Sequence, residues 1–182
     1  MTKTIAIGCD HGGPELKNEI AKFLCENGCN VIDCGIEVGE AVDYPVKAYE
    51  VAQHVVNGSA DLGILICGTG IGMSMCANKH RGIRAAVCSD TYSAKMTRCH
   101  NDANVLCIGA RVIGSCLALD IVDAFLGAEF EGGRHALRVD MMSEIENKEN
   151  KANGGKGGNH HRRHHRGNNK NKTKFQENKI WK

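Results

Sequence analysis

The sequence has no apolar run long enough to cross a lipid bilayer, which takes roughly 18 residues. Residues 1–4 lead directly into a short strand-like run and not into the apolar segment of a signal peptide. We therefore expect a soluble protein of the cytoplasm that makes no contact with a membrane. The length limits the number of domains, because 182 residues are enough for one domain and exclude a multidomain assembly.

A disulfide scaffold is not required either. The chain is 42% hydrophobic, and a domain of this size buries roughly two-thirds of the surface of its unfolded chain. Ten cysteines in a chain without an export signal should stay reduced, most of them as small buried hydrophobes with one or two left for chemistry. Cys25, Cys29 and Cys34 lack the paired short spacing of a zinc site, so we expect no structural metal there.

Net charge is small, at +2, because two parts of the chain with opposite signs nearly cancel. Residues 1–146 carry 12 Lys+Arg against 19 Asp+Glu, and residues 147–182 carry 11 basic against 2 acidic side chains. The second part has hardly any apolar side chains, so it cannot bury enough surface to offset the entropy lost on ordering. The sequence therefore predicts a folded domain over 1–146 and a disordered basic tail, rich in Asn, His, Lys and Gly, over 147–182.

Within the first part, short apolar runs alternate with segments of helical periodicity. Residues 4–8 are a continuous apolar run typical of a strand buried on both faces, and residues 14–27 place apolar side chains at helical spacing. The alternation predicts further strands at 30–34, 62–67, 83–88 and 104–108, and helices at 46–57, 71–79, 91–100, 114–126 and 133–146. We therefore expect an α/β protein, a three-layer α/β/α sandwich around a five-stranded parallel Rossmann-like sheet.

Ligands of such sheets bind beyond the carboxyl ends of the strands, and the glycine-rich turn Cys67–Gly72 lies at one of these ends. Glycines allow close approach of a ligand to the backbone, and free amides at the start of a helix favour an anion. A thiol in this position, Cys67, is a candidate nucleophile or base. The alternative is a tight strand–helix turn that binds nothing.

Three other segments are candidates for chemistry. Gly8–Gly13 places an acid, Asp10, and an imidazole, His11, after the first strand, although Asp10 could instead cap the helix that follows. His100 precedes a strand and is a candidate general acid or base. Arg134 and Arg138 share one helix face and suit a phosphate, or else form a solvated basic face.

Several motifs occur together and in order: Gly8–Gly13, Asp43–Pro45, Cys67–Gly72, Asn78–Lys79, Gly82–Ala85, His100–Leu106 and Gly132–His135. In this combination the chain closely resembles the sugar-phosphate isomerases of the ribose-5-phosphate isomerase B type, over residues 1 to about 146. The resemblance implies interconversion of ribose 5-phosphate and ribulose 5-phosphate in the pentose phosphate pathway, without a metal or an organic cofactor. It also implies a homodimer or tetramer whose active sites lie between subunits.

By this resemblance, Cys67 is the base that moves a proton between the first two sugar carbons through an enediolate, with Thr69 in the same catalytic group. His100 is the acid that opens the sugar ring. Amides of the glycine loop stabilise the enediolate, and cationic groups hold the phosphate. The implied substrate-binding set is Asp10, His11, Tyr44, Gly68, Thr69, Gly70, Ile71, Gly72, Asn101, Arg111, Arg134 and Arg138.

Other functions stay open at this point. An allose 6-phosphate or other hexose-phosphate isomerase is one alternative, and a regulator that binds a phosphosugar without catalysis is another. The basic tail could bind nucleic acid through phosphate neutralisation, but a solvated appendage without a partner explains it better. Its cluster His160–His165 could capture divalent metals weakly, for which low-complexity drift is the better explanation.

Overall fold

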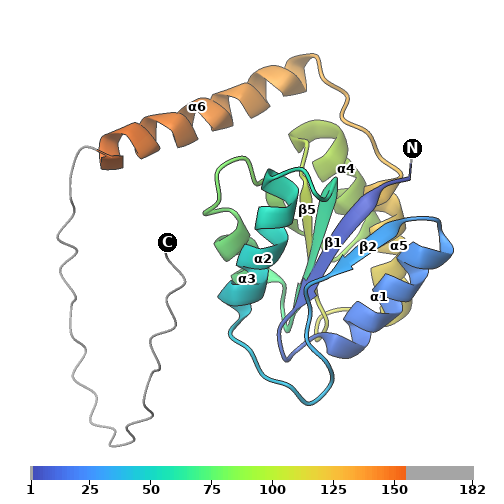
Figure 1. Cartoon of the computed structure of the whole chain (residues 1–182). Helices are drawn as coiled ribbons and strands as arrows, with labels where there is room; N and C mark the ends of the chain where they lie inside the picture. The colour runs from blue at the N-terminus through green and yellow to red at the C-terminus, as the bar shows by residue number, and fades with distance from the viewer. Residues whose placement is uncertain (1, 155–182) are drawn as a thin grey trace, which may run out of the picture.

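A computed structural model describes residues 2–154, with side chains up to residue 149 (Figure 1). Its strands are β1 (Thr4–Cys9), β2 (Asn30–Asp33), β3 (Leu62–Cys67), β4 (Ala85–Val87) and β5 (Val105–Gly109). Its helices are α1 (Pro14–Glu26), α2 (Tyr44–Val56), α3 (Ile71–Ala77), α4 (Thr91–Asn101), α5 (Ser115–Leu126) and α6 (Arg134–Gly154). Each predicted element is present, and no described helix is long and apolar enough to cross a membrane.

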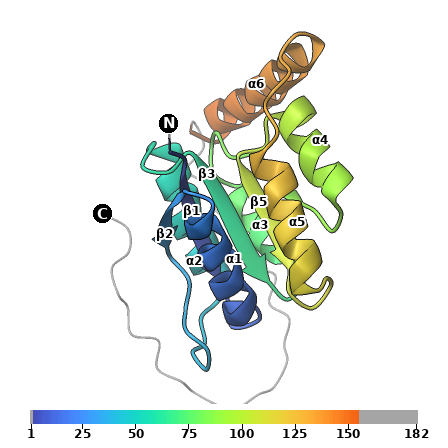
Figure 2. The ribbon, with the colours of Figure 1, turned by 90° about the vertical axis from the view of Figure 1, so that its right-hand side faces the viewer.

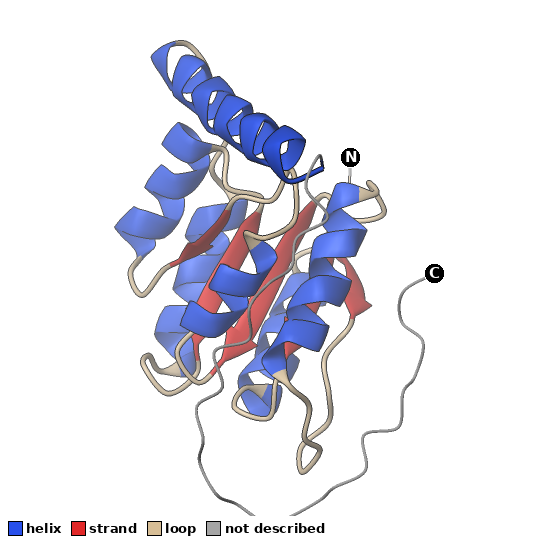
Figure 3. Ribbon diagram, turned by 90° about the vertical axis from the view of Figure 1, so that its left-hand side faces the viewer, coloured by secondary structure: helices blue, strands red, loops and turns tan. Residues whose placement is uncertain are grey.

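The strands form one parallel sheet in the order β2-β1-β3-β5-β4. Helices α1 and α5 cover one face, and α2 and α3 cover the other, so the predicted three-layer sandwich is confirmed (Figures 2 and 3). Helix α4 packs beside α5 at the β4 end of the sheet. The central strands β1, β3 and β5 are buried and apolar from end to end, except for Thr4 at the start of β1, because both of their faces are covered.

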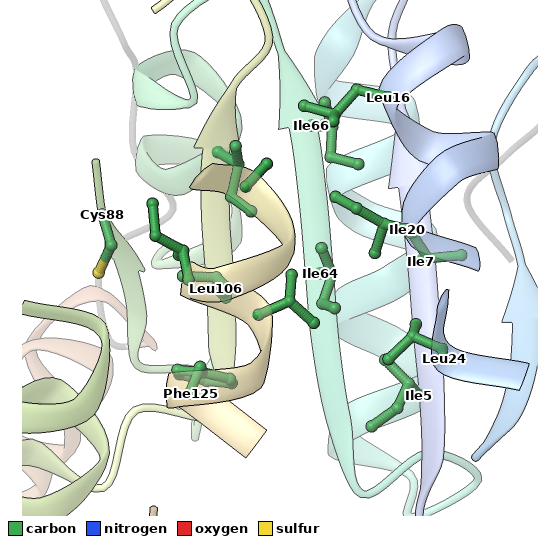
Figure 4. Close-up of a cluster of buried hydrophobic side chains, with 14 of the residues drawn as sticks. Ile5, Ile7, Leu16, Ile20, Leu24, Ile64, Ile66, Cys88, Leu106 and Phe125 are labelled. Carbon is green, nitrogen blue, oxygen red and sulfur yellow. The ribbon is translucent and has the colours of Figure 1, made fainter. Parts of the chain in front are cut away.

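The core is divided by the sheet into two hydrophobic clusters. The larger one lies under α1 and α5, where the side chains of Leu16, Ile20 and Phe125 pack on alternate residues of β1, β3 and β5 (Figure 4). The smaller one lies under α2 and α3 and includes Cys67 at the end of β3. Cys67 therefore emerges from the core on the α2/α3 side of the sheet.

The strand order creates a crevice between β1 and β3. The chain leaves β1 towards α1 on one face and leaves β3 towards α3 on the other, although the two strands are neighbours. The loops after these strands therefore diverge, and a ligand can approach the sheet edge between them. We call this side of the sheet the carboxyl edge and the opposite side, where the strands begin, the amino edge.

Helix α6 extends past the predicted domain boundary. The helix was expected to end at residue 146, but it continues to Gly154, so the first eight residues of the predicted disordered tail are helical. The segment after residue 146 contains Lys, Glu and Ala, which favour a helix once an earlier turn has nucleated it. The pair Glu144–Lys148, at 3.7 Å, adds one i,i+4 contact across the boundary. The rest of the predicted tail, 155–182, lies outside the described residues.

Candidate active site

The loops after β1, β3 and β5 meet at the carboxyl edge around a cavity of about 250 Å³. The loops after the outer strands, at Cys34 and Cys88, do not line this cavity. Its lining residues are Asp10, His11, Gly12, Tyr44, Cys67, Gly68, Thr69, Gly72 and Arg111. Residues from four separate segments of the chain are thus brought together, as expected for a ligand site at the switch point of a parallel sheet.

Cys67 is the buried thiol of this cavity. Its side chain is 5% exposed, and its Sγ accepts the backbone N–H of Gly70 at 3.0 Å. Gly70 can turn back towards the sulfur because its φ is +77°, a conformation that favours glycine. Elsewhere in the core, burial raises the pKa of the Cys88 thiol to about 11, which suits an inert packing role.

Asp10 is buried beside Cys67 and is held by the main chain. Its carboxylate accepts the backbone N–H of Gly12 at 2.7 Å, within its own loop. The alternative that Asp10 caps the following helix is wrong, because Gly13 occupies the N-cap of α1. A Cβ on Gly12 would lie 2.9 Å from the backbone nitrogen of Gly68, so the loops after β1 and β3 are in contact. Asp10 therefore has a fixed position in the lining of the cavity.

Tyr44 and Arg111 form two walls of the cavity. Tyr44 is the first residue of α2, and its ring lies 3.1 Å from the place where a Cβ on Gly72 would be. The Arg111 side chain passes over Gly68, and its backbone N–H donates to the Gly68 carbonyl at 3.1 Å. A Cβ on Gly72 would press on the Tyr44 ring, whereas one on Gly68 would make ordinary contact with Arg111 at 3.5 Å, so the close approach requires glycine at position 72. Arg111 brings a cationic group to a cavity that already holds His11.

His100 and Asn101 lie at the amino edge, away from Cys67. They are the last residues of α4, and the turn that follows leads into the start of β5. The Gly63 N–H donates to the carbonyl of Asn104 in this turn, and Cys67 lies four residues further along β3. At about 3.3 Å per residue, this separates the two groups by about 13 Å or more along the sheet. One chain therefore does not bring Cys67 and His100 into one site.

The turn after His100 is held by ion pairs with Asp102. Its carboxylate accepts from Arg84 at 2.6 Å and from Arg98 at 2.9 Å. Arg84 also donates to the Asp102 carbonyl at 2.7 Å, and Arg98 donates to the carbonyl of Ala103 at 2.7 Å. Asp102 has a φ of +47°, which is unusual for a residue other than glycine. Two guanidiniums thus fix the backbone that carries His100 and Asn101.

His100 also contacts the segment that leads into α6. Its ring stacks on that of His135, with centroids 4.2 Å apart and an interplanar angle of 2°. The Glu131 carboxylate lies 3.8 Å from His100 Nε2 and 3.7 Å from His135 Nε2. Burial, and then the charges of His100 and Arg134, lower the pKa of His135, so this ring is uncharged near neutral pH. Arg134 and Arg138 are exposed beside the stack in the first turns of α6.

The predicted site residues therefore fall into two groups. The carboxyl edge holds Asp10, His11, Tyr44, Arg111 and the whole loop 67–72, in which Thr69 Oγ1 accepts from the Ile71 N–H at 3.4 Å. The amino edge holds His100, Asn101, Arg134 and Arg138, and Asn101 lines a separate cavity of about 330 Å³ beside α6. Gly12, Glu131 and His135 were not predicted as site residues. Gly12 and His135 belong to motifs quoted above, whereas no sequence signal marked Glu131.

Comparison with known proteins agrees with this architecture. The family model described as Ribose/Galactose Isomerase matches residues 5–142. Ribose-5-phosphate isomerase B of Escherichia coli (strain K12) is 55% identical over 148 residues, covering 81% of this chain and 99% of that protein. D-erythrulose-4-phosphate isomerase of Pectobacterium atrosepticum is 48% identical over 147 residues, covering 80% and 97%. The solved structure of Clostridium thermocellum ribose-5-phosphate isomerase B is 57% identical, with a TM-score of 0.79 over 80% of this chain and 99% of that one. The chain belongs to the ribose/galactose isomerase family.

Proposed function

We propose that this protein is an aldose–ketose isomerase that interconverts D-ribose 5-phosphate and D-ribulose 5-phosphate, in the non-oxidative branch of the pentose phosphate pathway. The observation that carries the proposal is the buried Cys67 thiol, which accepts the Gly70 amide at the carboxyl edge of the sheet. The names of the E. coli and C. thermocellum relatives favour the five-carbon substrate.

In the proposed mechanism, Cys67 as thiolate removes a proton from one of the first two sugar carbons. The electrons of the broken C–H bond pass to the carbonyl oxygen, which gives an enediolate. The hydroxyl proton on the deprotonated carbon passes to the former carbonyl oxygen, and Cys67, now a thiol, returns its proton to the former carbonyl carbon, so no proton or electron is gained overall. Amides of the loop 68–72 that face the cavity donate to the negative oxygen of this intermediate. The reaction requires acid and base groups only.

The other groups at the carboxyl edge orient the substrate. Asp10, Tyr44 and Thr69 supply an acceptor and two hydroxyls for the sugar hydroxyls. His11 and Arg111, which lie at the exposed side of the cavity, suit the phosphate. Binding energy from the phosphate, which does not react, then helps to hold the reacting carbons near Cys67.

We propose that a second copy of the chain completes the site. Ribose 5-phosphate is mostly a closed ring, and the acid that opens it, His100, lies at the other edge with Asn101, Arg134 and Arg138. A twofold dimer lets the amino edge of each chain face the carboxyl edge of its partner, which gives two complete sites. Apolar side chains near both edges support such an interface, because Met75 on α3 and Leu137 on α6 are both 66% exposed.

Leu137 belongs to a stripe on α6 that continues with Met141 and Ile145, which are 57% and 61% exposed. Spacing of four residues places these side chains on one helix face. Burying such a stripe against a second chain removes apolar surface from water, in either a homodimer or a tetramer. For location we propose the cytoplasm, since ten free thiols suit a reducing compartment.

Turnover of ribose 5-phosphate by the wild type and by Cys67→Ala tests the proposed activity. General base catalysis contributes about 10²- to 10⁴-fold, so the variant should lose most of its kcat while still binding substrate. Cys116→Ala, which removes an exposed thiol on α5, is the matched control and should keep full activity. Undiminished turnover by Cys67→Ala would overturn the mechanism.

Substrate choice is tested in the same assay by comparing ribose 5-phosphate with allose 6-phosphate and D-erythrulose 4-phosphate. We expect the highest kcat/KM with ribose 5-phosphate. A higher kcat/KM with the six-carbon or four-carbon substrate would leave the proposed catalytic residues unchanged but would show that ribose 5-phosphate is not the preferred substrate. Binding of all three without turnover would favour a regulator that holds a phosphosugar without catalysis.

A further inference from the structure

The cluster of His100, Glu131 and His135 at the amino edge has the composition of a metal site. In the part of the chain that the structure describes, it is the one group of three such side chains whose ligand atoms all lie within 4.8 Å of one another. Two imidazoles and one carboxylate are the ligand set of several catalytic zinc sites, which keep a fourth position open for water or substrate. The activity proposed above assigns a role to His100 alone and leaves the other two side chains unused.

We propose that Glu131, His100 and His135 form a binding site for a divalent cation of the zinc class, and that the bound ion inhibits the isomerase by engaging His100. The inhibitory part rests on the ring-opening role proposed for His100. The binding part rests only on the geometry of the three side chains.

The backbone builds this arrangement. Glu131 and His135 are four residues apart, and between them Gly132 and Gly133 have φ values of +64° and +55°. This turn brings the carboxylate over the imidazole that follows it, at 3.7 Å. The Glu131 N–H donates to the carbonyl of Cys99 at 3.0 Å, which anchors the turn next to His100. The three ligands thus come from two segments that are hydrogen-bonded to each other.

Two of the three distances require only a small adjustment, whereas the third, between the two imidazole nitrogens, lies within 4.8 Å and must shorten by up to about 1.4 Å. Ligand atoms on a tetrahedral zinc ion at about 2.0–2.1 Å are about 3.4 Å apart. The carboxylate lies 3.8 and 3.7 Å from the two Nε2 atoms, so each of these edges must shorten by a few tenths of an ångström. The His100 ring, which is parallel to that of His135, must also tilt so that both nitrogens face a shared ion. His100, which is 35% exposed, has room to rotate, whereas His135 is buried and stays in place.

Charge around the cluster limits the affinity. Arg134 Nε donates a hydrogen bond to His135 Nε2 at 3.4 Å, which the ion must displace, and Arg138 lies one turn further along α6. Both guanidiniums repel a cation, and only Glu131 carries a compensating charge in the cluster. We therefore expect reversible binding, weaker than in a structural zinc site, which suits inhibition that responds to the concentration of the ion.

Inhibition follows from the atom that the ion occupies. The Nε2 atom of His100 faces Glu131, and coordination would occupy its lone pair. A coordinated imidazole nitrogen cannot take up and release the proton needed to open the sugar ring. Turnover of ribose 5-phosphate should therefore fall as zinc is added and recover when a chelator removes it.

The test uses zinc chloride and the full chain, with His160, His161, His164 and His165 replaced by Gln so that tail histidines do not bind the ion. Titration calorimetry compares this reference with two further changes, Glu131→Gln and the matched control Glu129→Gln, whose carboxylate is also exposed two residues away. Glu131→Gln should weaken the zinc affinity by about tenfold or more, while Glu129→Gln should leave it unchanged. Thiols that bind zinc contribute equally to all three proteins.

Inhibition is measured alongside, with each protein normalised to its own turnover without zinc. The midpoint of inhibition should move to higher zinc concentration in Glu131→Gln by the same factor as the affinity. Equal zinc affinity in Glu131→Gln and the reference would overturn the proposed site. If Glu131→Gln weakens zinc binding but zinc does not affect turnover, the metal site is supported and the ring-opening role of His100 is overturned.

Discussion

The two edges of the sheet hold their functional side chains by different means. At the carboxyl edge, backbone amides from tight glycine turns fix Cys67 and Asp10. At the amino edge, ion pairs between side chains fix the turn after His100, with Asp102 between two guanidiniums. A parallel sheet places a crevice at its carboxyl edge through its topology alone. The amino edge has no such inherent site, and its ordered surface supports the proposal that it presents groups to another chain.

The largest expected effect comes from mixing two inactive variants, one altered at each edge, which tests whether the two edges act in different chains. Cys67→Ala and His100→Asn should each lower turnover of ribose 5-phosphate by about 10²- to 10⁴-fold. Once subunits have exchanged in an equal mixture, half of the dimers are mixed, and each mixed dimer holds one site with both wild-type groups. Activity should therefore return to about a quarter of the wild-type value, measured per chain.

The control is each variant exchanged with itself, which should stay inactive. Activity that stays at the level of the single variants after exchange, verified by mass spectrometry of the mixed dimers, would mean that both groups act within one chain. The two edges would then have to meet through a rearrangement of the monomer.

The next effect comes from Asp102→Asn, which tests whether the ion pairs at the amino edge hold His100 in position. Asp102→Asn removes the charge opposite Arg84 and Arg98 but keeps a residue type that tolerates positive φ. These pairs are partly buried, so the loss of stability should be about 1–3 kcal/mol, between the values for exposed and buried pairs. Displacement of His100 should lower turnover of ribose 5-phosphate by about tenfold or more.

A second readout separates the two edges. Ribulose 5-phosphate has no ring to open, so exchange of its carbon-bound proton with D₂O depends on Cys67 and should be preserved in Asp102→Asn. Asp61→Asn is the matched control, because Asp61 also lies at the amino edge, where it accepts the backbone N–H of Thr4 at 2.7 Å. An equal loss of exchange and turnover in Asp102→Asn would show that the ion pairs stabilise the whole fold and not the position of His100.

The fold could be predicted closely because local pattern and tertiary environment agree. Strand β3 was predicted to the residue, since an unbroken apolar run lies between Asp61 and the glycine loop. The strand predicted at 83–88 is shorter, Ala85–Val87. A side chain bears on its start: the Arg84 N–H donates to the Asn104 side chain, and the ladder with β5 begins at Ala85, which pairs with Val105. Such a contact depends on residues distant in the sequence.

The sequence predicted a set of candidate site residues, but it did not show that these residues lie at two opposite edges of the sheet. Motifs marked Cys67 and His100 as candidates, and the position of His100 just before β5 already places it at the amino edge of a parallel sheet. The stacking of His135 on His100 could not be predicted, because it depends on a glycine turn packing against the end of α4. Sequence spacing carries no information on such a contact, which only the tertiary structure defines.

The smallest expected effect is a decrease in stability at high pH caused by the buried Cys88 thiol, which separates unfolding from loss of catalytic activity. Cys88, 3% exposed at the end of β4, has a pKa raised by burial, and then by the charge of Asp90, to about 11. In the unfolded chain this thiol ionises near its ordinary value of 9.0. Between these values the unfolded state binds fewer protons than the folded state, so stability is fully present below pH 9 and falls as the pH rises towards 11.

One thiol contributes about 1.4 kcal/mol per pH unit in this window, and other buried thiols, such as Cys107, add to the slope. Urea unfolding at pH 8, 9, 10 and 11 should show a shallower decline for Cys88→Ala than for the wild type, whereas the exposed-site control Cys116→Ala should follow the wild type. Identical slopes for all three would mean that Cys88 ionises in the folded core. Activity measured over the same pH range separates two causes. A loss of activity above pH 9 that precedes unfolding reflects ionisation of groups at the two edges, whereas a loss that coincides with unfolding reflects the core that supports both edges.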